Sequence, residues 1–283
     1  MTANRAKAQK DPGRSASPRV PVAMIGGLPI AVIDRMECAR LMVAAAMARR
    51  DAPGPALVFT SANGQVLSMC EADDDIRAMF LASDLINADG MPLVFASQLL
   101  SDHKLPARVA TTALIYEVAE IAQGCGTTFY LLGAAKGGIE RAAQHLRELY
   151  PRLEIVGCRN GYFKPDEEAD TVAAINDARP DILWLGLGVP AEQRFAIRNR
   201  DRLRGVGLIK TSGGLFDFLS GKNRRAPDWM QAAGLEWAYR IYMEPKRLVG
   251  RYVRTNPHAL FLLLTKTRQG RAREDAGRME NSS

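Results

Sequence analysis

From residue 22 onward, short apolar runs alternate with longer amphipathic stretches along the chain. The short runs are typical of buried β-strands, and the longer stretches carry apolar residues at helical spacing. The predicted strands are 56–60, 84–88, 127–132, 154–157, 181–187 and 206–211, and the predicted helices are 73–82, 91–100, 138–150, 171–177 and 191–200. Strands that alternate with helices predict an α/β, Rossmann-like fold, with a mostly parallel sheet and helices on both faces.

The pattern changes towards both ends of the chain, which predicts four segments. Residues 1–20 are rich in Pro, Ser, Gly and basic residues and contain little to bury, so we expect a disordered basic tail. Residues 21–226 carry the alternating pattern and are the predicted α/β domain. Residues 227–265 show a helical pattern only, which predicts a basic helical appendage, and residues 266–283 are expected to form a flexible tail.

Five of the six predicted strands end in small or polar residues. The ends are residues 60–64, 89–90, 133–138, 186–190 and 211–214. Because ligands of open α/β sheets bind beyond the carboxyl ends of the strands, such ends are expected to share one crevice. Their composition favours a nucleotide-type ligand.

Asp89 is the only carboxylate among these strand ends, and Gly90 follows it. The glycine allows a tight turn and close approach of a ligand. Two interpretations are open. Asp89 could act as a general base, or it could cap the helix that is predicted to begin at Met91.

A glycine-rich turn, residues 133–138, joins a predicted strand to a predicted helix. Gly133 and Lys136 could therefore hold a phosphate or ribose near a helix N-terminus. The turn is not GxGxxG and lacks an acidic residue at the ribose-binding distance, so support for NAD is weak. The run Asp73-Asp74-Asp75 opens a predicted helix, where acidic residues favour the positive end of the dipole, so we do not expect a metal there.

The net charge of +7 is concentrated towards the two ends of the chain. Residues 1–19 hold five basic residues and one acidic residue, and residues 222–254 hold eight and three. On one continuous helix, Arg240, Arg247, Arg251 and Arg254 would share a face suited to phosphate. We therefore expect a polyanionic partner, such as nucleotide phosphates or an anionic membrane surface. No nucleic-acid-binding motif is present in the sequence.

The remaining composition excludes several kinds of site. The cysteines, at positions 38, 70, 125 and 158, are widely spaced, and three histidines are scattered, so neither a zinc site nor a disulfide framework is indicated. No secretory signal opens the sequence, and no apolar run is long enough to predict a membrane-spanning helix. A homo-oligomer is compatible with the sequence.

Several motifs occur in an order that resembles the WecG/TagA/CpsF family of bacterial glycosyltransferases. They are SANGQ at 61–65, ASDLINADGMPLV at 82–94, FYLLGAAKGG at 129–138, VGCRNGYF at 156–163, PDILWLGLGVPAEQRF at 180–195, GGLFDFLSGKNRRAPDWM at 213–230 and LEWAYRIYMEPKRLVGRY at 235–252. Each motif alone is weak, but the ordered set spans most of residues 22–255 and is specific.

The resemblance implies an inverting, metal-independent enzyme that needs no cofactor. It would move N-acetylmannosamine, glucose or a uronic acid from a UDP-sugar to an undecaprenyl-pyrophosphate-linked sugar during synthesis of an exopolysaccharide or other cell-surface polymer. It would work as a peripheral protein on the cytoplasmic face of the membrane. One alternative, suggested by the glycine-rich turn, is an NAD-dependent nucleotide-sugar dehydrogenase or epimerase. Another, suggested by the basic ends, is a nucleic-acid-binding protein.

The resemblance also implies roles for individual residues. Asp89 would be the catalytic base, and Ser61, Asn63 and Asp217 would lie in the substrate pocket. The catalytic arginines of the appendage would be Arg240, Arg247 and Arg251, although Arg240 could instead pair with Glu244. The family's Pro-Lys-Gln-Glu motif is here Pro190-Ala191-Glu192-Gln193, so Glu192 and Gln193 are expected donor contacts in exchanged order.

Overall fold

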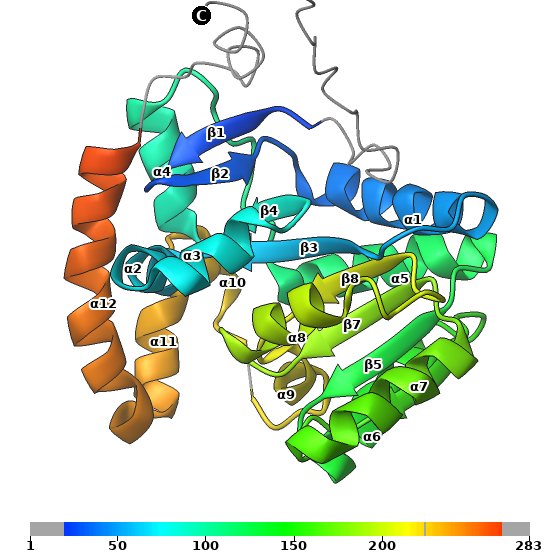
Figure 1. The fold of residues 1–283 in the computed structure, drawn as a ribbon. Helices are drawn as coiled ribbons and strands as arrows, with labels where there is room; N and C mark the ends of the chain where they lie inside the picture. The colour runs from blue at the N-terminus through cyan, green and yellow to red at the C-terminus, as the bar shows by residue number, and fades with distance from the viewer. Residues whose placement is uncertain (1–19, 224, 268–283) are drawn as a thin grey trace, which may run out of the picture.

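The structure, a computed structural model, describes residues 20–223 and 225–267, and the side chains of Asp228, Ala232, Arg247 and Arg251 lie outside that description. A six-stranded parallel sheet forms its centre (Figure 1). In spatial order the strands are β4 (Leu85–Ala88), β3 (Leu57–Ala62), β8 (Leu208–Thr211), β7 (Ile182–Gly186), β5 (Phe129–Gly133) and β6 (Ile155–Arg159). All six predicted strands are present, and the predicted parallel α/β sheet is confirmed.

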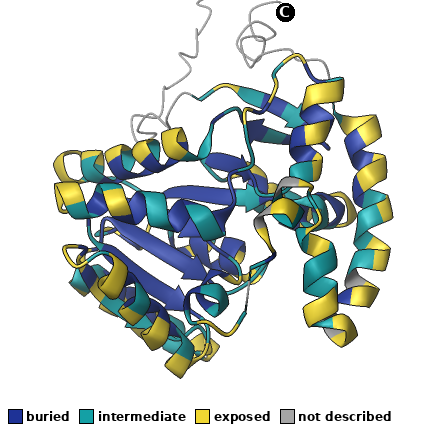
Figure 2. Cartoon of the chain, turned by 180° about the vertical axis from the view of Figure 1, so that it is seen from behind, coloured by how far each residue is buried: buried dark blue, intermediate teal, exposed yellow. Residues whose placement is uncertain are grey.

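Helices cover both faces of this sheet. On one face, apolar side chains of the strands pack against α1 (Arg35–Asp51), α5 (Thr111–Cys125), α6 (Lys136–Leu149) and α9 (Leu215–Leu219). The other face packs against α7 (Glu168–Ala178), which follows the 3-10 turn η1 (Pro165–Glu167), and α8 (Ala191–Asn199). In Figure 2 the central strands are almost entirely buried, while the outer faces of the helices are exposed, and the edge strand β6 is only partly buried.

Side-chain caps fix where several helices begin. Asp34 accepts from the backbone N–H of Glu37, and the Glu37 carboxylate accepts from the backbone N–H of Asp34, so α1 begins with a capping box. Asp73 caps α3 (Asp74–Leu81) by accepting from the N–H of Ile76 at 3.0 Å. The acidic run at 73–75 is therefore the start of a helix, as the sequence predicts.

A second, smaller core lies beside the edge strand β4. It contains an antiparallel hairpin of β1 (Val22–Ile25) and β2 (Leu28–Ala31), which pairs separately from the main sheet. It also contains α2 (Gly64–Ala72), α3 and α4 (Met91–Leu100). The sequence pattern did not predict the hairpin, α1, α2 or α5.

Residues 228–266 are helical, as predicted, but they form three helices rather than one. They are α10 (Asp228–Ala232), α11 (Glu236–Met243) and α12 (Pro245–Lys266). Pro245 is the first residue of α12. A proline at that position begins a new helix and does not continue the preceding one. The expected continuous face of Arg240, Arg247, Arg251 and Arg254 is therefore wrong, because Arg240 belongs to α11 and the others to α12.

Helix α12 packs against α2, α4 and β1, and lies beside α11 (Figure 1). Leu262 and Leu263 are buried in the second core. The end of the helix is held by the β1–β2 turn, where the N–H of Gly27 donates to the carbonyl of Lys266 at 3.0 Å and the N–H of Gly26 donates to Thr267 Oγ1 at 3.1 Å. Helix α12 is therefore an integral part of this core.

The predicted basic tail 1–20 lies almost wholly outside the described residues, as does nearly all of the predicted tail 266–283. Within the described parts of the chain, no helix is long and apolar enough to cross a membrane.

Candidate active site

The loops that follow the parallel strands meet at the carboxyl edge of the sheet. Ser61 and Ala62 in β3 lie opposite Asn87 and Ala88 in β4, which places the loop after β3 beside Asp89. On the other side of β3, β8 leads into Ser212 and Gly213, next to the end of β7. Helix α11 lies beyond this edge (Figure 1). The end of β5 lies beside the end of β7, so the polar strand ends predicted from the sequence share this edge.

Asp89 follows β4 directly and does not cap α4. The N-cap of α4 is Gly90, without a side-chain hydrogen bond, so the capping interpretation of Asp89 is wrong. Asp89 Oδ2 instead lies 3.5 Å from the backbone N–H of Thr111, at the start of α5. This is a long contact, so the carboxylate is weakly satisfied. Burial raises the pKa of Asp89, and the nearby charges of Arg108, Arg240 and Lys210 offset only part of that effect.

Arg240 reaches the carboxyl edge from α11. Its Nη2 lies 3.3 Å from Glu236 Oε1, and the other oxygen of Glu236 accepts from Arg108 Nη1 at 2.9 Å. Arg240 thus forms an ion pair with Glu236, four residues earlier on the same helix. The Arg240 guanidinium also lies over the Phe218 ring, 5.1 Å from its centroid. Two guanidiniums and one carboxylate therefore lie near Asp89.

Arg247 and Arg251 belong to α12, and their side chains lie outside the described structure. The catalytic roles that the sequence predicts for them therefore stay predictions.

Ser61 and Asn63 occupy the end of β3, and each has a partner within the protein. Asn63 caps α2 by accepting from the N–H of Val66 at 3.1 Å. Ser61 Oγ lies 2.8 Å from Lys210 Nζ and 3.2 Å from Thr111 Oγ1. Both residues lie at the predicted edge, with Ser61 in a network of polar side chains.

Glu192 and Gln193 begin α8 and are almost completely buried. Glu192 Oε2 accepts from the N–H of Gly213 at 2.8 Å. Burial raises the pKa of Glu192 to about 7, although this hydrogen bond and the charge of Lys210 act to lower it. Gln193 Nε2 donates to Thr60 Oγ1 at 3.1 Å, which in turn lies 2.8 Å from Thr211 Oγ1.

The side-chain oxygen of Gln193 is buried and has no hydrogen-bond partner among the described residues. A buried polar atom without a partner is costly. Gln193 is 0% exposed, so this oxygen is closed off from solvent, and a ligand would reach it only after the surrounding side chains move.

Gly133 ends β5 with a φ of 155°, where a Cβ would stand 2.3 Å from the carbonyl oxygen of Gly186. Close packing of β5 against β7 therefore explains this glycine without a dinucleotide. Lys136, three residues later, is exposed in the first turn of α6. Its predicted contact with the substrate remains a prediction.

Asp217 lies in α9, just after the loop that follows β8. Its Oδ1 is 3.2 Å from Lys222 Nζ. The next residue, Phe218, is the one that contacts Arg240, so α9 and α11 meet beside this carboxylate. The structure thus places Asp217 at the predicted edge, in an ion pair.

Sequence reasoning missed Arg108, Thr111 and Lys210. Lys210 is completely buried in the central strand β8. A lysine within the apolar run Val206–Thr211 of a predicted central strand is the signal that could have found it. Arg108 lies between α4 and α5, and Thr111 is the first residue of α5. No motif marks either residue, so only tertiary structure brings them to Asp89.

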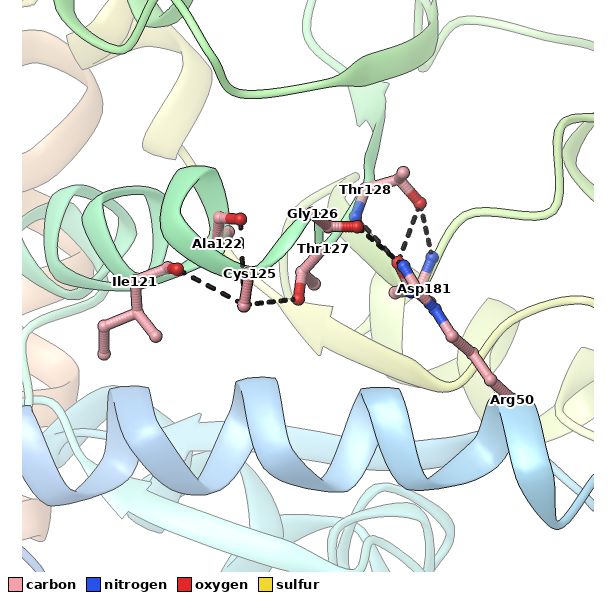
Figure 3. Close-up of polar contacts among 8 residues, drawn as sticks. All are labelled: Arg50, Ile121, Ala122, Cys125, Gly126, Thr127, Thr128 and Asp181. Carbon is pink, nitrogen blue, oxygen red and sulfur yellow. Dashed lines mark hydrogen bonds and ion pairs between the residues drawn. The ribbon is translucent and has the colours of Figure 1, made fainter.

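The opposite, amino edge of the sheet also holds a polar cluster (Figure 3). Asp181, just before β7, accepts from Arg50 Nε at 2.6 Å and from Arg50 Nη2 at 2.5 Å. It also accepts from the N–H and hydroxyl of Thr128, at 2.7 Å and 3.0 Å. Burial acts to raise the pKa of Asp181, but the hydrogen bonds from Arg50 and Thr128 outweigh it and hold the pKa below its ordinary value.

A cavity of about 840 Å³ lies beside this cluster and is lined by Arg49, Arg50, Arg204 and Asp181, among others. It is separated from Asp89 by the length of the strands. Because Asp181 is fully engaged in joining α1, β5 and β7, we assign this cluster a structural role.

The carboxyl edge can thus support acid–base chemistry next to an anionic leaving group. It offers a half-buried carboxylate with a raised pKa and cationic side chains around it. Within the described residues, no three His, Cys, Asp or Glu side chains are grouped so that they could hold a metal ion.

Comparison with known proteins identifies the family of this chain. The model of the WecG/TagA/CpsF family of glycosyl transferases matches residues 23–273. The chain is also 30% identical over 190 residues to an N-acetylglucosaminyldiphosphoundecaprenol N-acetyl-beta-D-mannosaminyltransferase of Bacillus subtilis (strain 168). That alignment covers 67% of this chain and 73% of the relative.

Proposed function

The chain belongs to the WecG/TagA/CpsF family of glycosyltransferases, and from this premise we propose the reaction that it catalyses. It transfers a sugar from a UDP-sugar to a sugar linked to undecaprenyl pyrophosphate, with inversion at the anomeric carbon and without a metal. The Bacillus subtilis relative, whose name states a polyprenyl-diphosphate acceptor and a mannosaminyl group, supports this acceptor class and N-acetylmannosamine as the first donor sugar to test.

The environment of Asp89 is the observation that carries this proposal. An inverting transfer needs one base that removes the proton of the acceptor hydroxyl while that oxygen attacks the anomeric carbon. Asp89 directly follows β4, the edge strand of the sheet. Its carboxylate has one long hydrogen bond within the described chain. Burial raises its pKa, which makes it a stronger base than an exposed aspartate.

The leaving group is UDP, whose β-phosphate gains negative charge as the glycosidic bond breaks. Arg240 lies near the base, and its guanidinium is fixed by Glu236 and Phe218. A fixed cation stabilises developing charge without having to reorganise. Arg108 holds the second oxygen of Glu236 and so helps to orient Arg240. Arg247 and Arg251 are proposed as further phosphate contacts.

The donor is proposed to bind over the ends of β3, β7 and β8. Glu192, Ser61 and Asn63 line this edge, and Gln193, which is buried behind them, stays a proposed donor contact. Glu192 is protonated over much of the pH range in which most carboxylates are charged, since burial raises its pKa to about 7. A neutral Glu192 avoids repelling the diphosphate.

We propose that the protein binds peripherally to the cytoplasmic face of the membrane. The exposed side of α12 carries apolar residues, namely Val249, Val253, Leu260, Phe261 and Leu264. Basic residues on the same helix supply attraction to anionic lipid, worth about 1 kcal/mol each near the surface.

The test is a transfer assay with a panel of UDP-sugars and a polyprenyl-pyrophosphate-linked N-acetylglucosamine, run in the presence of EDTA. We expect transfer from one UDP-sugar, resistance to EDTA, and a product whose anomeric configuration is opposite to that of the donor. Retention of configuration would contradict a single-base displacement. Consumption of NAD with a UDP-sugar, and no transfer, would instead support the dehydrogenase alternative.

A further inference from the structure

Lys210 occupies a position where a strand of this kind normally buries an apolar side chain. It lies in β8, between β3 and β7, and its exposed fraction is 0%. Its neighbours in the strand, Leu208 and Ile209, belong to the apolar cores on the two faces of the sheet. Burying an ammonium group costs several kcal/mol unless partners compensate it. A lysine at this position therefore calls for an explanation beyond packing.

The ammonium group makes two hydrogen bonds inside the protein. Lys210 Nζ donates to Ser61 Oγ at 2.8 Å and to the backbone carbonyl of Thr211, the next residue, at 3.0 Å. An ammonium group can only donate, so the Ser61 oxygen must accept from it. The hydroxyl hydrogen of Ser61 is then free to point to Thr111 Oγ1, 3.2 Å away.

Thr111 completes a path to the proposed base. Its backbone N–H faces Asp89 Oδ2 at 3.5 Å. The path Lys210–Ser61–Thr111–Asp89 thus joins the central strand β8 to the loop after the edge strand β4. It connects a buried cation to the carboxylate through two residues that are themselves fixed in β3 and α5.

Three titratable groups on three different elements act on Lys210. Asp89 approaches from the loop after β4, Glu192 from α8 and the Cys38 thiol from α1. Burial raises the pKa of Cys38 to about 11, so that thiol is neutral near pH 7. Burial lowers the pKa of Lys210, and the two carboxylates act against this. On its other side, Asp89 faces Arg108, Arg240 and Glu236.

We propose that Lys210 is a positioning residue for the transfer reaction, which orients Asp89 through Ser61 and Thr111 and favours its ionised, proton-accepting form. This inference rests on the proposed role of Asp89 as the base. Lys210 itself does not contact the substrate. Arg108 and Arg240 can exchange their interactions with Asp89 for interactions with the donor diphosphate, whereas Lys210 remains within the sheet and keeps its effect throughout the reaction.

The experiment compares wild-type protein with Lys210→Met in the full-length chain. The pKa of Asp89 is measured by NMR titration of ¹³C-labelled aspartate, with Asp89→Asn to assign the signal, and the pH dependence of kcat is measured alongside. We expect Lys210→Met to raise the Asp89 pKa by about one unit or more, as removal of a nearby charge does. The acidic limb of the kcat profile should move to higher pH by the same amount.

Two variants separate this effect from other causes. Glu192→Gln removes the other titrating carboxylate, so a shift that persists in that background belongs to Asp89. Lys164→Met removes an exposed lysine and should leave both the Asp89 pKa and transfer unchanged. An Asp89 pKa that does not change in a folded Lys210→Met protein would overturn the proposal.

Ser61→Ala provides a second test if Lys210→Met does not fold. This variant removes the hydroxyl that links Lys210 to Thr111 but keeps the charge of Lys210, and it should also shift the pKa of Asp89. An unchanged titration in Ser61→Ala would overturn the positioning role. Because the NMR titration needs no turnover, an altered Asp89 pKa in a protein without transferase activity would refute the proposed function and not the coupling to Lys210.

Discussion

Each edge of the parallel sheet holds an aspartate beside a loop, and the two carboxylates have opposite environments. At the amino edge, Asp181 accepts four hydrogen bonds from Arg50 and Thr128, and its pKa is lowered. At the carboxyl edge, the Asp89 carboxylate accepts one hydrogen bond from the described part of the chain, at 3.5 Å, and its pKa is raised. The first carboxylate stabilises its ionised form by bonds within the protein. The second leaves its bonding capacity for a substrate, which is the expected signature of a base.

The largest effect should come from replacing the carboxylate at the carboxyl edge. Asp89→Asn should lower kcat by about a thousandfold, because general-base catalysis contributes on that order. Its melting temperature should stay the same or rise. The raised pKa means that the folded state binds the proton more tightly, so stability falls as pH rises through that pKa, and an uncharged side chain avoids this loss.

The assay is sugar transfer together with UDP binding by calorimetry, and we expect binding to persist in Asp89→Asn. The matched control is Asp177→Asn, which changes an exposed carboxylate at the amino edge and should leave transfer unaffected. A folded Asp89→Asn protein with wild-type turnover would remove Asp89 from the mechanism.

Next in size is the guanidinium beside the base. Arg240→Gln should lower kcat by about a hundredfold, as is typical when one fixed group that stabilises developing charge is removed. Arg240→Lys should recover only part of this, since an ammonium group lacks the planar fork that Glu236 and Phe218 hold. Arg141→Gln on α6 removes an exposed guanidinium and serves as the control. Equal turnover in Arg240→Gln and Arg141→Gln would exclude a specific role.

Replacing the carboxylate at the amino edge should lower the stability of the fold and leave sugar transfer unchanged. Asp181→Asn should reduce the free energy of unfolding by about 2 kcal/mol, because Arg50 and Thr128 lose charged partners. The half-exposed Arg50 keeps this loss moderate. The pKa of Asp181 is lowered in the folded state, so its contribution is present at pH 7 and is lost as pH falls through that pKa.

Urea unfolding at pH 7 and at about pH 3, below the ordinary pKa of an aspartate, measures this difference. The difference in the free energy of unfolding between wild type and Asp181→Asn should be smaller at the lower pH. An equal difference in the free energy of unfolding at both pH values would show that the ionised Asp181 carboxylate does not stabilise this edge.

The smallest effect concerns Glu192. Its pKa of about 7 means that it gains negative charge as the pH rises from 6 to 8. We expect the KM for the anionic donor to rise about threefold over this range in the wild type, through repulsion of the diphosphate. Glu192→Gln should abolish the rise, whereas Glu168→Gln, in a carboxylate paired with Arg198, should not. A rise that persists in Glu192→Gln would place the titrating group elsewhere.

Local pattern was sufficient for the sheet and for part of the site. Five of the six strands of the parallel sheet are short apolar runs followed by small or polar residues, and this signal located Asp89 and Ser61 at one edge. Glu192 was named only through the family resemblance. Local pattern failed for the β1–β2 hairpin, whose stability comes from contact with α2 and α12 rather than from its own sequence. It also failed at Pro245, where helical periodicity on both sides concealed the break between α11 and α12.

The residues missed in the site share one physical cause. Arg108 and Glu236 are 128 positions apart, and Lys210 and Ser61 are 149 apart, so no local spacing relates them. The charge pattern drew attention to the basic C-terminal helices. The buried cation that faces Asp89 from within the sheet was overlooked, because a single lysine contributes little to any regional charge.

The hydrogen bonds between the β1–β2 turn and the end of α12 can form only after α12 has been synthesised, so the second core cannot be completed earlier. They join positions 241 residues apart, one near each end of the described chain. A ribosome delivers the hairpin first and the helix last, so the apolar faces of β1 and β2 stay uncovered for most of synthesis. Closure over so long a separation is slow compared with local pairing. A nascent chain interrupted before residue 245 would lack the whole of α12, and so would offer chaperones and proteases an open second core rather than a smaller working enzyme.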